Sequence, residues 1–145
     1  IRTLRELGVR RMTLDSRAVR AGDAFIACPG ENRDGRDFIA DAIGRGASAV
    51  LWEVEGGNGG PYVWNRRWRV ANFAVPQLRR HAGEIAGEFY GRPSSKLWTI
   101  GVTGTNGKTS CSQWIARALT RTRRKCAVVG TLGSGFPGKL DASVN

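Results

Sequence analysis

The sequence predicts an α/β protein in which a small mixed α/β domain precedes the first strand-helix-strand unit of a parallel sheet. Short apolar runs and helical periodicity alternate along residues 11–89. Residues 91–96, GRPSSK, then interrupt both patterns with glycine, proline and serine. Beyond them an apolar run, a glycine-rich turn and an amphipathic helix follow one another directly. We therefore expect one domain over residues 1–94 and the start of another over residues 95–145.

The first half of the first domain is predicted to hold short strands around one helix. Residues 11–19 and 23–30 are apolar runs bounded by turn residues, residues 29–38 indicate a loop, and residues 47–53 indicate a buried strand. A helix is expected over residues 37–46, because apolar side chains fall on one face and glycines follow them: Phe38, Ile39, Ala42 and Ile43, then Gly44 and Gly46.

The second half is predicted to add a loop, two strands and another helix. The glycines of residues 56–60 indicate a flexible loop. Residues 62–65 and 68–73 are expected to be short strands on either side of an arginine-rich turn. Helical spacing begins at Val75, and its apolar face consists of Leu78, Ala82, Ile85 and Phe89. This helix must stop by Gly91 and Pro93.

The second domain opens with the pattern of a strand, a helix and a second strand. The strands are expected over residues 97–104 and 125–130, and the helix over residues 108–122. The helix is predicted to turn Ile115, Ala118 and Leu119 inward. Such a unit is the right-handed beginning of a parallel sheet covered by helices.

Composition limits the classes of protein that need to be considered. The net charge of +11 suggests nucleic acid, but the basic residues are scattered pairs rather than one stripe, so small polyanions fit equally well. No window approaches the roughly 18 apolar residues of a membrane span, and the start lacks a signal peptide, so the cytoplasm is expected. Three cysteines and one histidine support neither a disulfide framework nor a zinc site, and we expect Cys28, Cys111 and Cys126 to be small buried hydrophobes.

The turn TGTNGKTS, residues 103–110, carries the strongest chemical signal. Backbone N–H groups and the positive end of a helix dipole converge there, which suits a phosphate. Gly104 and Gly107 would let the backbone approach phosphate oxygens, Lys108 would place an ammonium against the transferred phosphate, and the Thr109 hydroxyl would bind magnesium. The strict P-loop pattern fails, because the residue five positions before Gly107 is Val102. A general nucleotide triphosphatase and a chance glycine loop remain alternatives.

Two segments resemble the Mur ligases. Residues 101–110, GVTGTNGKTS, resemble their ATP-binding loop, which lacks the first glycine of the P-loop pattern. Residues 13–53, with D-S-R, G-D, G-x-x-x-D-G-R and G-A, are similar to the N-terminal domain of the members that add the third and terminal residues of the stem peptide. Residues 129–145 resemble the third-residue member. The related folylpolyglutamate synthetases usually carry G-K-G and lack the D-S-R region.

The resemblance implies an ATP-dependent ligase of peptidoglycan precursor synthesis. It would join a diamino acid, meso-diaminopimelate or lysine, to UDP-N-acetylmuramoyl-L-alanyl-D-glutamate through an acyl phosphate. Addition of the terminal dipeptide, another P-loop-type ATPase and a basic nucleic-acid-binding module are the alternatives. The match reaches only the UDP-sugar-binding domain and the start of a P-loop-type parallel-sheet ATPase domain, so it leaves the acidic magnesium ligands, the carbamylated lysine and the C-terminal domain outside this chain. This piece alone is expected to be inactive.

The resemblance also assigns site residues. Lys108 would be catalytic and Thr109 would bind Mg²⁺, and the ATP loop would comprise Gly104, Thr105, Asn106, Gly107, Lys108, Thr109 and Ser110. The UDP substrate would meet Leu14, Ser16, Glu31, Asn32, Arg33 and Asn145. Ser16 would donate to a phosphate, whereas Glu31 and Asn32 differ from the residues often found there and suggest backbone contacts. For Asp15 and Arg17 the alternative is a structural ion pair that holds the loop.

Overall fold

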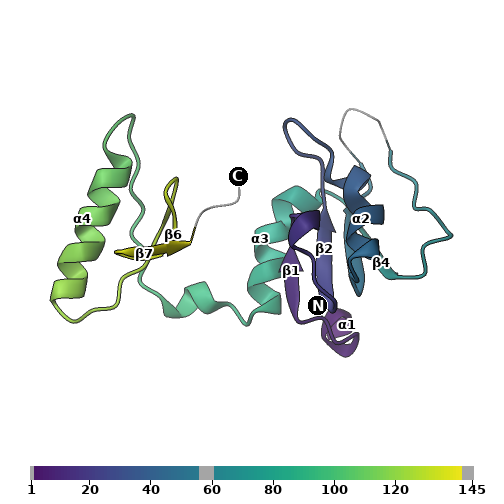
Figure 1. Ribbon diagram of the computed structural model, residues 1–145, viewed down its shortest axis with the longest axis horizontal. Helices are drawn as coiled ribbons and strands as arrows, with labels where there is room; N and C mark the ends of the chain where they lie inside the picture. Colours follow the sequence, from purple (N-terminus) through teal and green to yellow (C-terminus); the bar gives the residue numbers. More distant parts are fainter. Residues whose placement is uncertain (1, 56–60, 142–145) are drawn as a thin grey trace. The chain divides into compact units, whose positions relative to one another are not determined.

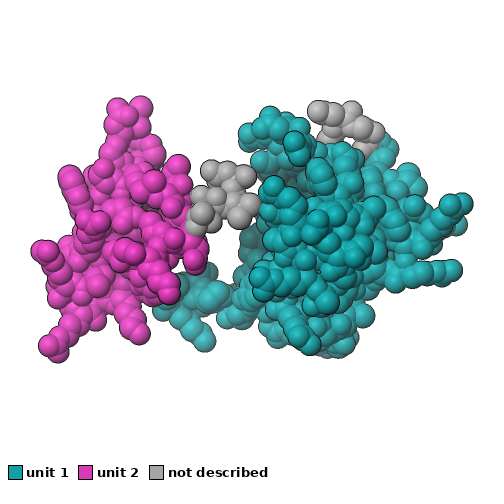
Figure 2. Space-filling model, viewed as in Figure 1, with its two compact units in different colours: residues 1–97 teal, residues 98–145 magenta. Residues whose placement is uncertain are grey.

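The computed structural model describes residues 2–55 and 61–141, and the chain divides into two compact units, Ile1–Leu97 and Trp98–Asn145 (Figures 1 and 2). Both units combine helices and strands, and unit 1 is built on a parallel sheet. The predicted α/β class is therefore confirmed. The loop expected at residues 56–60 lies outside the described residues, as does Asn145.

Unit 1 contains a four-stranded sheet in the order β1-β2-β3-β4, with every neighbouring pair parallel. Its strands are Arg11–Thr13, Asp23–Ala27, Ala49–Glu53 and Ala71–Val75. Every residue of the central strands β2 and β3 is buried. Strands covered on both faces read as continuous apolar runs, which is why the sequence indicated these two.

Helices cover both faces of this sheet. On one face α1 (Arg2–Glu6) and α3 (Leu78–Phe89) bury Leu4, Leu78 and Phe89 against alternate residues of β2 and β3. On the other face α2 (Ile39–Gly44) buries Ile39 and Ala42 against Phe25 and Val50. Successive strand residues point to opposite faces of the sheet, so each central strand contributes side chains to the apolar cores on both faces. Figure 1 shows α2 and α3 on opposite sides of the sheet.

Several local expectations for unit 1 were wrong. The helix expected over residues 37–46 is split into a 3₁₀ helix, η2 (Gly35–Phe38), and α2, although its predicted apolar face is buried or half-buried. Residues 62–65 form no strand. Tyr62 and Trp64 instead pack their rings on Trp52, with centroids 5.7 and 5.9 Å apart. The two rings of this segment therefore belong to an aromatic cluster rather than to a strand. The short helix α1 was not predicted.

Unit 2 contains one helix and a small antiparallel sheet. Helix α4 spans Lys108–Arg121, and β5 (Val128–Gly130), β6 (Gly133–Phe136) and β7 (Lys139–Asp141) pair in sequence order. Before them a 3₁₀ helix, η3 (Pro93–Lys96), closes unit 1. The strand expected at residues 125–130 is present in its second half.

Two expectations for unit 2 were wrong. The strand predicted over residues 97–104 does not form, because no strand of the described chain pairs with it, and Leu97, Trp98 and Ile100 are exposed. In α4 the fully buried side chain is Ala116, whereas Ala118 is exposed and Ile115 and Leu119 are half-buried. The inward face is therefore rotated from the predicted one.

Two remaining expectations concern cysteines and membranes. Cys28 and Cys126 are half-buried, but Cys111 is exposed, so the expectation of a buried side chain was wrong there. Among the described residues, every helix is too short or too polar to cross a bilayer.

Candidate functional site

The predicted UDP-substrate residues follow two neighbouring strands at one edge of the parallel sheet. Strand β1 ends at Thr13 and β2 ends at Ala27, and the two strands are paired. Leu14 and Ser16 follow the first strand, and residues 31–33 follow the second. Parallel α/β sheets bind ligands in the crevice beyond the carboxyl ends of their strands. The topology therefore places both predicted segments at the edge where such a site forms.

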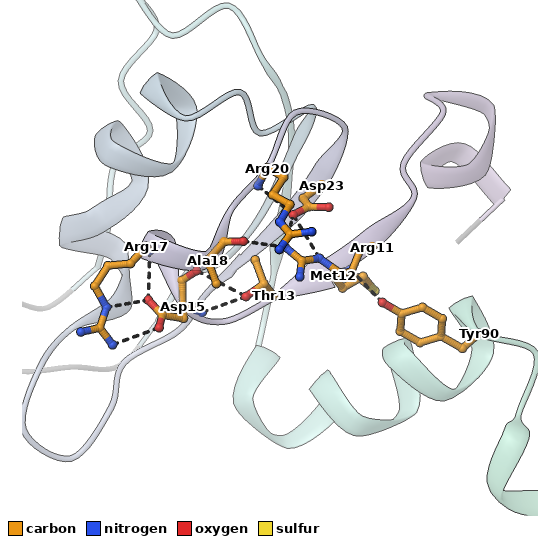
Figure 3. Close-up of polar contacts among 9 residues, drawn as sticks. All are labelled: Arg11, Met12, Thr13, Asp15, Arg17, Ala18, Arg20, Asp23 and Tyr90. Carbon is orange, nitrogen blue, oxygen red and sulfur yellow. Dashed lines mark hydrogen bonds and ion pairs between the residues drawn. The ribbon is translucent and has the colours of Figure 1, made fainter. Parts of the chain in front are cut away.

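The D-S-R segment is a 3₁₀ helix, η1 (Ser16–Ala18), capped by Asp15. One Asp15 oxygen accepts from the backbone N–H and from Nε of Arg17, each at 2.9 Å, and the other accepts from Arg17 Nη2 at 3.0 Å (Figure 3). Hydrogen bonding from this guanidinium holds the pKa of Asp15 below its ordinary value. Asp15 and Arg17 thus form a local ion pair that shapes the turn.

Arg11 ties this turn to the sheet. Its Nη2 lies 2.6 Å from Asp23 Oδ2 and donates to the carbonyl oxygen of Ala18 at 2.5 Å, as the dashed lines of Figure 3 show. The same Asp23 oxygen accepts the backbone N–H of Arg20 at 2.8 Å. The Arg11–Asp23 pair therefore joins the start of β1, the end of η1 and the approach to β2.

Ser16 and Leu14 differ sharply in exposure. Ser16 is buried, whereas Leu14 is 61% exposed. Within residues 2–55 and 61–141, no hydrogen bond of the Ser16 hydroxyl is found, and its backbone carbonyl accepts from Val19 at 3.3 Å. Asp15 alone supplies the side-chain cap of η1.

The second segment is a small hairpin over residues 28–35. Gly35 N–H donates to the carbonyl oxygen of Cys28 at 3.0 Å, and Gly30 N–H donates to that of Arg33 at 2.8 Å. Pro29 and Asp34 form a bridge between them. Glu31, Asn32 and Arg33 occupy the exposed tip. No hydrogen bond or ion pair within the described chain joins this tip to Leu14 or Ser16.

The base of this hairpin repeats the Asp-x-Arg arrangement of the first segment. Asp34 caps η2 by accepting from the backbone N–H of Arg36 at 2.9 Å, and its carboxylate lies 2.6 Å from Arg36 Nη2. Burial acts to raise the pKa of Asp34, but the hydrogen bonds from Arg36 outweigh it and the pKa is lowered. Unlike Arg17, Arg36 is buried.

Two further residues near the hairpin were not predicted from the sequence. Glu53 ends β3, is buried, and accepts the backbone N–H of Arg79 at 3.1 Å, so it caps the start of α3. Arg79 in turn donates to the carbonyl oxygen of Pro29 at 3.4 Å and pairs with Glu31 at 3.6 Å. The available signal was the carboxylate directly after a buried apolar run.

The predicted ATP loop lies in unit 2 at the start of α4. Gly104 and Gly107 have φ values of 140° and 78°. Residues with a Cβ atom rarely adopt this backbone conformation. Lys108 folds back over the turn, and its Nζ donates to the carbonyl oxygens of Gly104, at 2.5 Å, and Thr105, at 3.2 Å. All residues from Thr103 to Cys111 are exposed. The first N–H groups of α4 lack helical partners by geometry, so the turn can receive an anion.

The metal expectation can be tested against the donor groups present. Among the described residues, no three His, Cys, Asp or Glu side chains gather as a metal site. Thr109 offers one exposed hydroxyl at the start of α4. This fits a single protein ligand of a magnesium ion that is otherwise held by phosphate and water oxygens, as is usual for Mg²⁺ beside nucleotides.

A parallel α/β unit with polar loops at its carboxyl edge, followed by a glycine turn at a helix start, is typical of nucleotide-binding proteins. Residues 8–90 match the family described as "Mur ligase family, catalytic domain". The chain therefore belongs to the Mur ligase family, and the resemblance seen in the sequence is confirmed.

Similar proteins agree with this assignment. Proteins named UDP-N-acetylmuramoyl-L-alanyl-D-glutamate--2,6-diaminopimelate ligase are 49% identical in Nitrosomonas europaea, over 93% of this chain and 25% of theirs, and 49% in Pseudomonas aeruginosa, over 95% and 27%. The Neisseria meningitidis serogroup A protein of this name is 43% identical over 94% of this chain and 27% of its own. The chain thus spans about a quarter of the length of these curated relatives.

Solved structures share the fold. A 2,6-diaminopimelate ligase has a TM-score of 0.58 and 32% identity over 89% of this chain and 25% of its own. The MurF ligase from Thermotoga maritima, solved with ADP, has a TM-score of 0.54 and 32% identity over 82% and 25%. MurF from Acinetobacter baumannii, at 22% identity and a TM-score of 0.64 over 91% and 30%, shows the fold alone.

Proposed function

We propose that this chain is the first part of an ATP-dependent ligase that joins 2,6-diaminopimelate to UDP-N-acetylmuramoyl-L-alanyl-D-glutamate in peptidoglycan precursor synthesis. The observation that carries the proposal is the agreement of names among relatives that are 43–49% identical over 84–95% of the chain. Those names favour 2,6-diaminopimelate over lysine, and third-residue addition over addition of the terminal dipeptide. The reaction belongs in the cytoplasm, where ATP is supplied.

The two units would divide the two nucleotides between them. Residues 1–94 would form the UDP-sugar-binding domain and residues 95–145 the start of the ATP-binding domain. The separation of the chain into units over Ile1–Leu97 and Trp98–Asn145 supports this division, and the family match over residues 8–90 falls within the first unit.

The ATP loop would act through electrostatics and positioning. Lys108 would exchange the carbonyl oxygens of Gly104 and Thr105 for phosphate oxygens, and the N–H groups from Asn106 to Ser110 would surround the same phosphates. Thr109 would hold Mg²⁺, which when bound neutralises phosphate charge. An acidic substrate approaching a triphosphate is repelled, and fixed positive groups offset that repulsion.

The proposed ligation would proceed in two chemical steps. A free carboxylate oxygen of the D-glutamate residue attacks the γ-phosphorus, the bond from that phosphorus to the bridging oxygen of ADP breaks, and an acyl phosphate forms. The amino group of 2,6-diaminopimelate then attacks the acyl carbon, loses a proton and expels inorganic phosphate. Lys108 would stabilise the negative charge that moves onto ADP in the first step.

The UDP end of the substrate would lie at the carboxyl edge of the parallel sheet. Ser16 would donate to a phosphate, Leu14 would offer its exposed apolar side chain to uracil, and the hairpin tip would contribute backbone groups of residues 31–33. Asn145 would touch the sugar-peptide portion. The placement of both segments after paired parallel strands supports this arrangement.

A ligation assay on the full-length protein that carries this sequence tests the proposal. The protein is incubated with ATP, Mg²⁺ and UDP-N-acetylmuramoyl-L-alanyl-D-glutamate, together with meso-diaminopimelate or lysine, and the nucleotide product is identified by mass. We expect an ATP-dependent product with diaminopimelate and little with lysine. A protein that instead accepts only the tripeptide nucleotide and D-alanyl-D-alanine would contradict the proposal.

A Lys108→Ala variant tests the proposed role of the ATP loop. Loss of one partner of a desolvated charge pair costs roughly 2–5 kcal/mol, so turnover should fall more than tenfold while the circular dichroism spectrum is unchanged. Activity above a tenth of wild type would remove Lys108 from the catalytic role.

A further inference from the structure

Arg36 is an arginine in the interior of unit 1, with 2% of its surface exposed. An arginine side chain is rarely buried unless it is paired, because the charge loses its hydration. Here the carboxylate of Asp34 accepts from Nε at 3.0 Å and from Nη2 at 2.6 Å, which is the two-bond geometry that a guanidinium favours. The cost of burial is thus offset by directed hydrogen bonds.

The guanidinium joins three segments at the carboxyl edge of the sheet. Besides Asp34 at the base of the hairpin, its Nη1 donates to the carbonyl oxygen of Glu53 at 3.3 Å, where β3 ends. Its central carbon lies 5.3 Å from the centre of the Tyr62 ring, within the range of a cation-π contact. Hairpin, central strand and aromatic cluster are therefore fixed to one another through one side chain.

The hairpin itself is closed by bonds within its own backbone, which leave its direction relative to the sheet unspecified. Within the described residues, its side-chain polar contacts to other segments come from Arg36 at the base and Arg79 near the tip. Arg79 and Glu31 are both more than half exposed, so their ion pair is weak in water. The buried Arg36 is therefore the stronger of the two restraints.

We propose that Arg36 is a positioning residue of the UDP-substrate site, which orients residues 31–33 through Asp34 without touching the substrate. This inference rests on the proposed function. A buried guanidinium that holds Asp34, the end of β3 and Tyr62 together fixes the angle at which the hairpin leaves the sheet. A binding loop must be held to within about half an ångström for its backbone groups to meet a ligand.

Substitution by lysine separates positioning from stability. Arg36→Lys keeps the positive charge but loses the planar two-bond geometry toward Asp34 and the guanidinium that lies over the Tyr62 ring. In the full-length protein, we expect the KM for the UDP substrate to rise about 5- to 50-fold, with the KM for ATP and kcat changed less than threefold. Arg36→Met is measured in parallel and should raise the same KM further. Arg92→Met, which removes an exposed ion pair with Glu88 at the end of α3, is the matched control and should leave both KM values unchanged.

The outcomes are distinct. A folded Arg36→Lys protein whose KM for the UDP substrate stays within twofold of wild type overturns the inference, as does an equal loss for both substrates, which marks a purely structural role. Should Arg36→Met fail to fold, the lysine variant alone decides. Wild-type protein that does not ligate at all contradicts the proposed function instead, so the two failures cannot be confused.

Discussion

Two Asp-x-Arg pairs in unit 1 share one local geometry but differ in energy. In each, the aspartate caps a 3₁₀ helix and binds the guanidinium two residues later. Arg17 is mostly exposed, so water screens its pair with Asp15 and the pair contributes little to stability. Arg36 is buried, and removing one partner of a buried pair costs about 3–5 kcal/mol. The same three-residue pattern is thus a turn on the surface and an anchor in the interior.

Asp23 should make stability depend on pH in the acid range. Hydrogen bonding from Arg11 lowers its pKa below the unfolded value of about 3.9. The stabilisation that the Asp23 carboxylate provides is therefore complete above the unfolded pKa. It is lost as pH falls through the pKa of the folded protein. We expect Asp23→Asn to lower the free energy of unfolding by about 1–2 kcal/mol at neutral pH and by much less at pH 2. The expected loss is small for an ion pair because Arg11 is 40% exposed and water screens its charge. Urea unfolding of the wild-type and Asp23→Asn proteins, from pH 2 to neutral pH, measures the free energy of unfolding under both conditions.

The control for this measurement is Asp41→Asn, because Asp41 pairs with Arg45 on the exposed surface of α2. Asp41→Asn should leave the dependence of stability on acid pH close to that of the wild-type protein. Asp15 and Asp34 contribute to this dependence in both proteins. An Asp23→Asn protein that loses stability equally at every pH would show that Asp23 acts through packing rather than charge.

At this scale the sequence reveals local partners better than distant ones. The Asp15–Arg17 ion pair could be anticipated, because both groups belong to one turn. The burial of Arg36 could not, since arginine is most often exposed and its further contacts, Glu53 and Tyr62, lie 17 or more residues away. Arg11 and Asp23 likewise meet only because β1 and β2 pair in register.

The hairpin over residues 28–35 depends on a close approach of its two arms. A Cβ added at Gly35 would lie 2.6 Å from the carbonyl oxygen of Cys28. We therefore expect Gly35→Ala to destabilise the protein by about 1–3 kcal/mol through crowding of backbone atoms that cannot move aside. Thermal unfolding followed by circular dichroism measures the change.

Gly83→Ala provides the opposite result in the same assay. Gly83 lies inside α3, and a Cβ added there meets nothing within 4 Å. Alanine is favoured over glycine in a helix interior, so the variant should be more stable by about 0.5–1 kcal/mol. A Gly35→Ala protein as stable as Gly83→Ala would show that the hairpin opens without cost.

Elements with strong patterns were predictable and weakly partnered ones were not. The buried strands β2 and β3 and the helix α3 follow from continuous apolar runs and helical spacing. Residues 62–65 were expected to be a short strand beside an arginine-rich turn, but the rings of Tyr62 and Trp64 pack on Trp52 instead. Residues 97–104 have strand composition, yet pairing is a property of the neighbouring segment as well as of the sequence itself.

The buried apolar residues are shared unequally between the two units. Among described residues, Ala116 and Val128 are those of unit 2, and every other lies in unit 1, including the largest fully buried side chains, Phe25, Ile39, Leu78 and Val50. Apolar burial is the main favourable term in folding, so unit 1 has far the larger share of the stabilising free energy.

A fragment of residues 1–97 should therefore fold alone. We expect it to unfold cooperatively in urea, with one transition by both fluorescence and circular dichroism. A fragment of residues 98–145 should show no cooperative transition, because small chains with little buried apolar surface are marginal. A sharp transition in the shorter fragment, or its absence in the longer one, would contradict this reading of the core.

The hydroxyl of Tyr90 also bears on how copies of this protein meet one another. Strand β1 is terminal in the parallel sheet, and an open terminal strand is a template for edge-to-edge aggregation. Tyr90 accepts the backbone N–H of Met12 at 2.9 Å and so occupies a donor that an incoming strand would need. The three-residue length of β1 and the charge of Arg11 act in the same direction. Growth of the sheet across molecules is thus disfavoured along β1, even in concentrated solution.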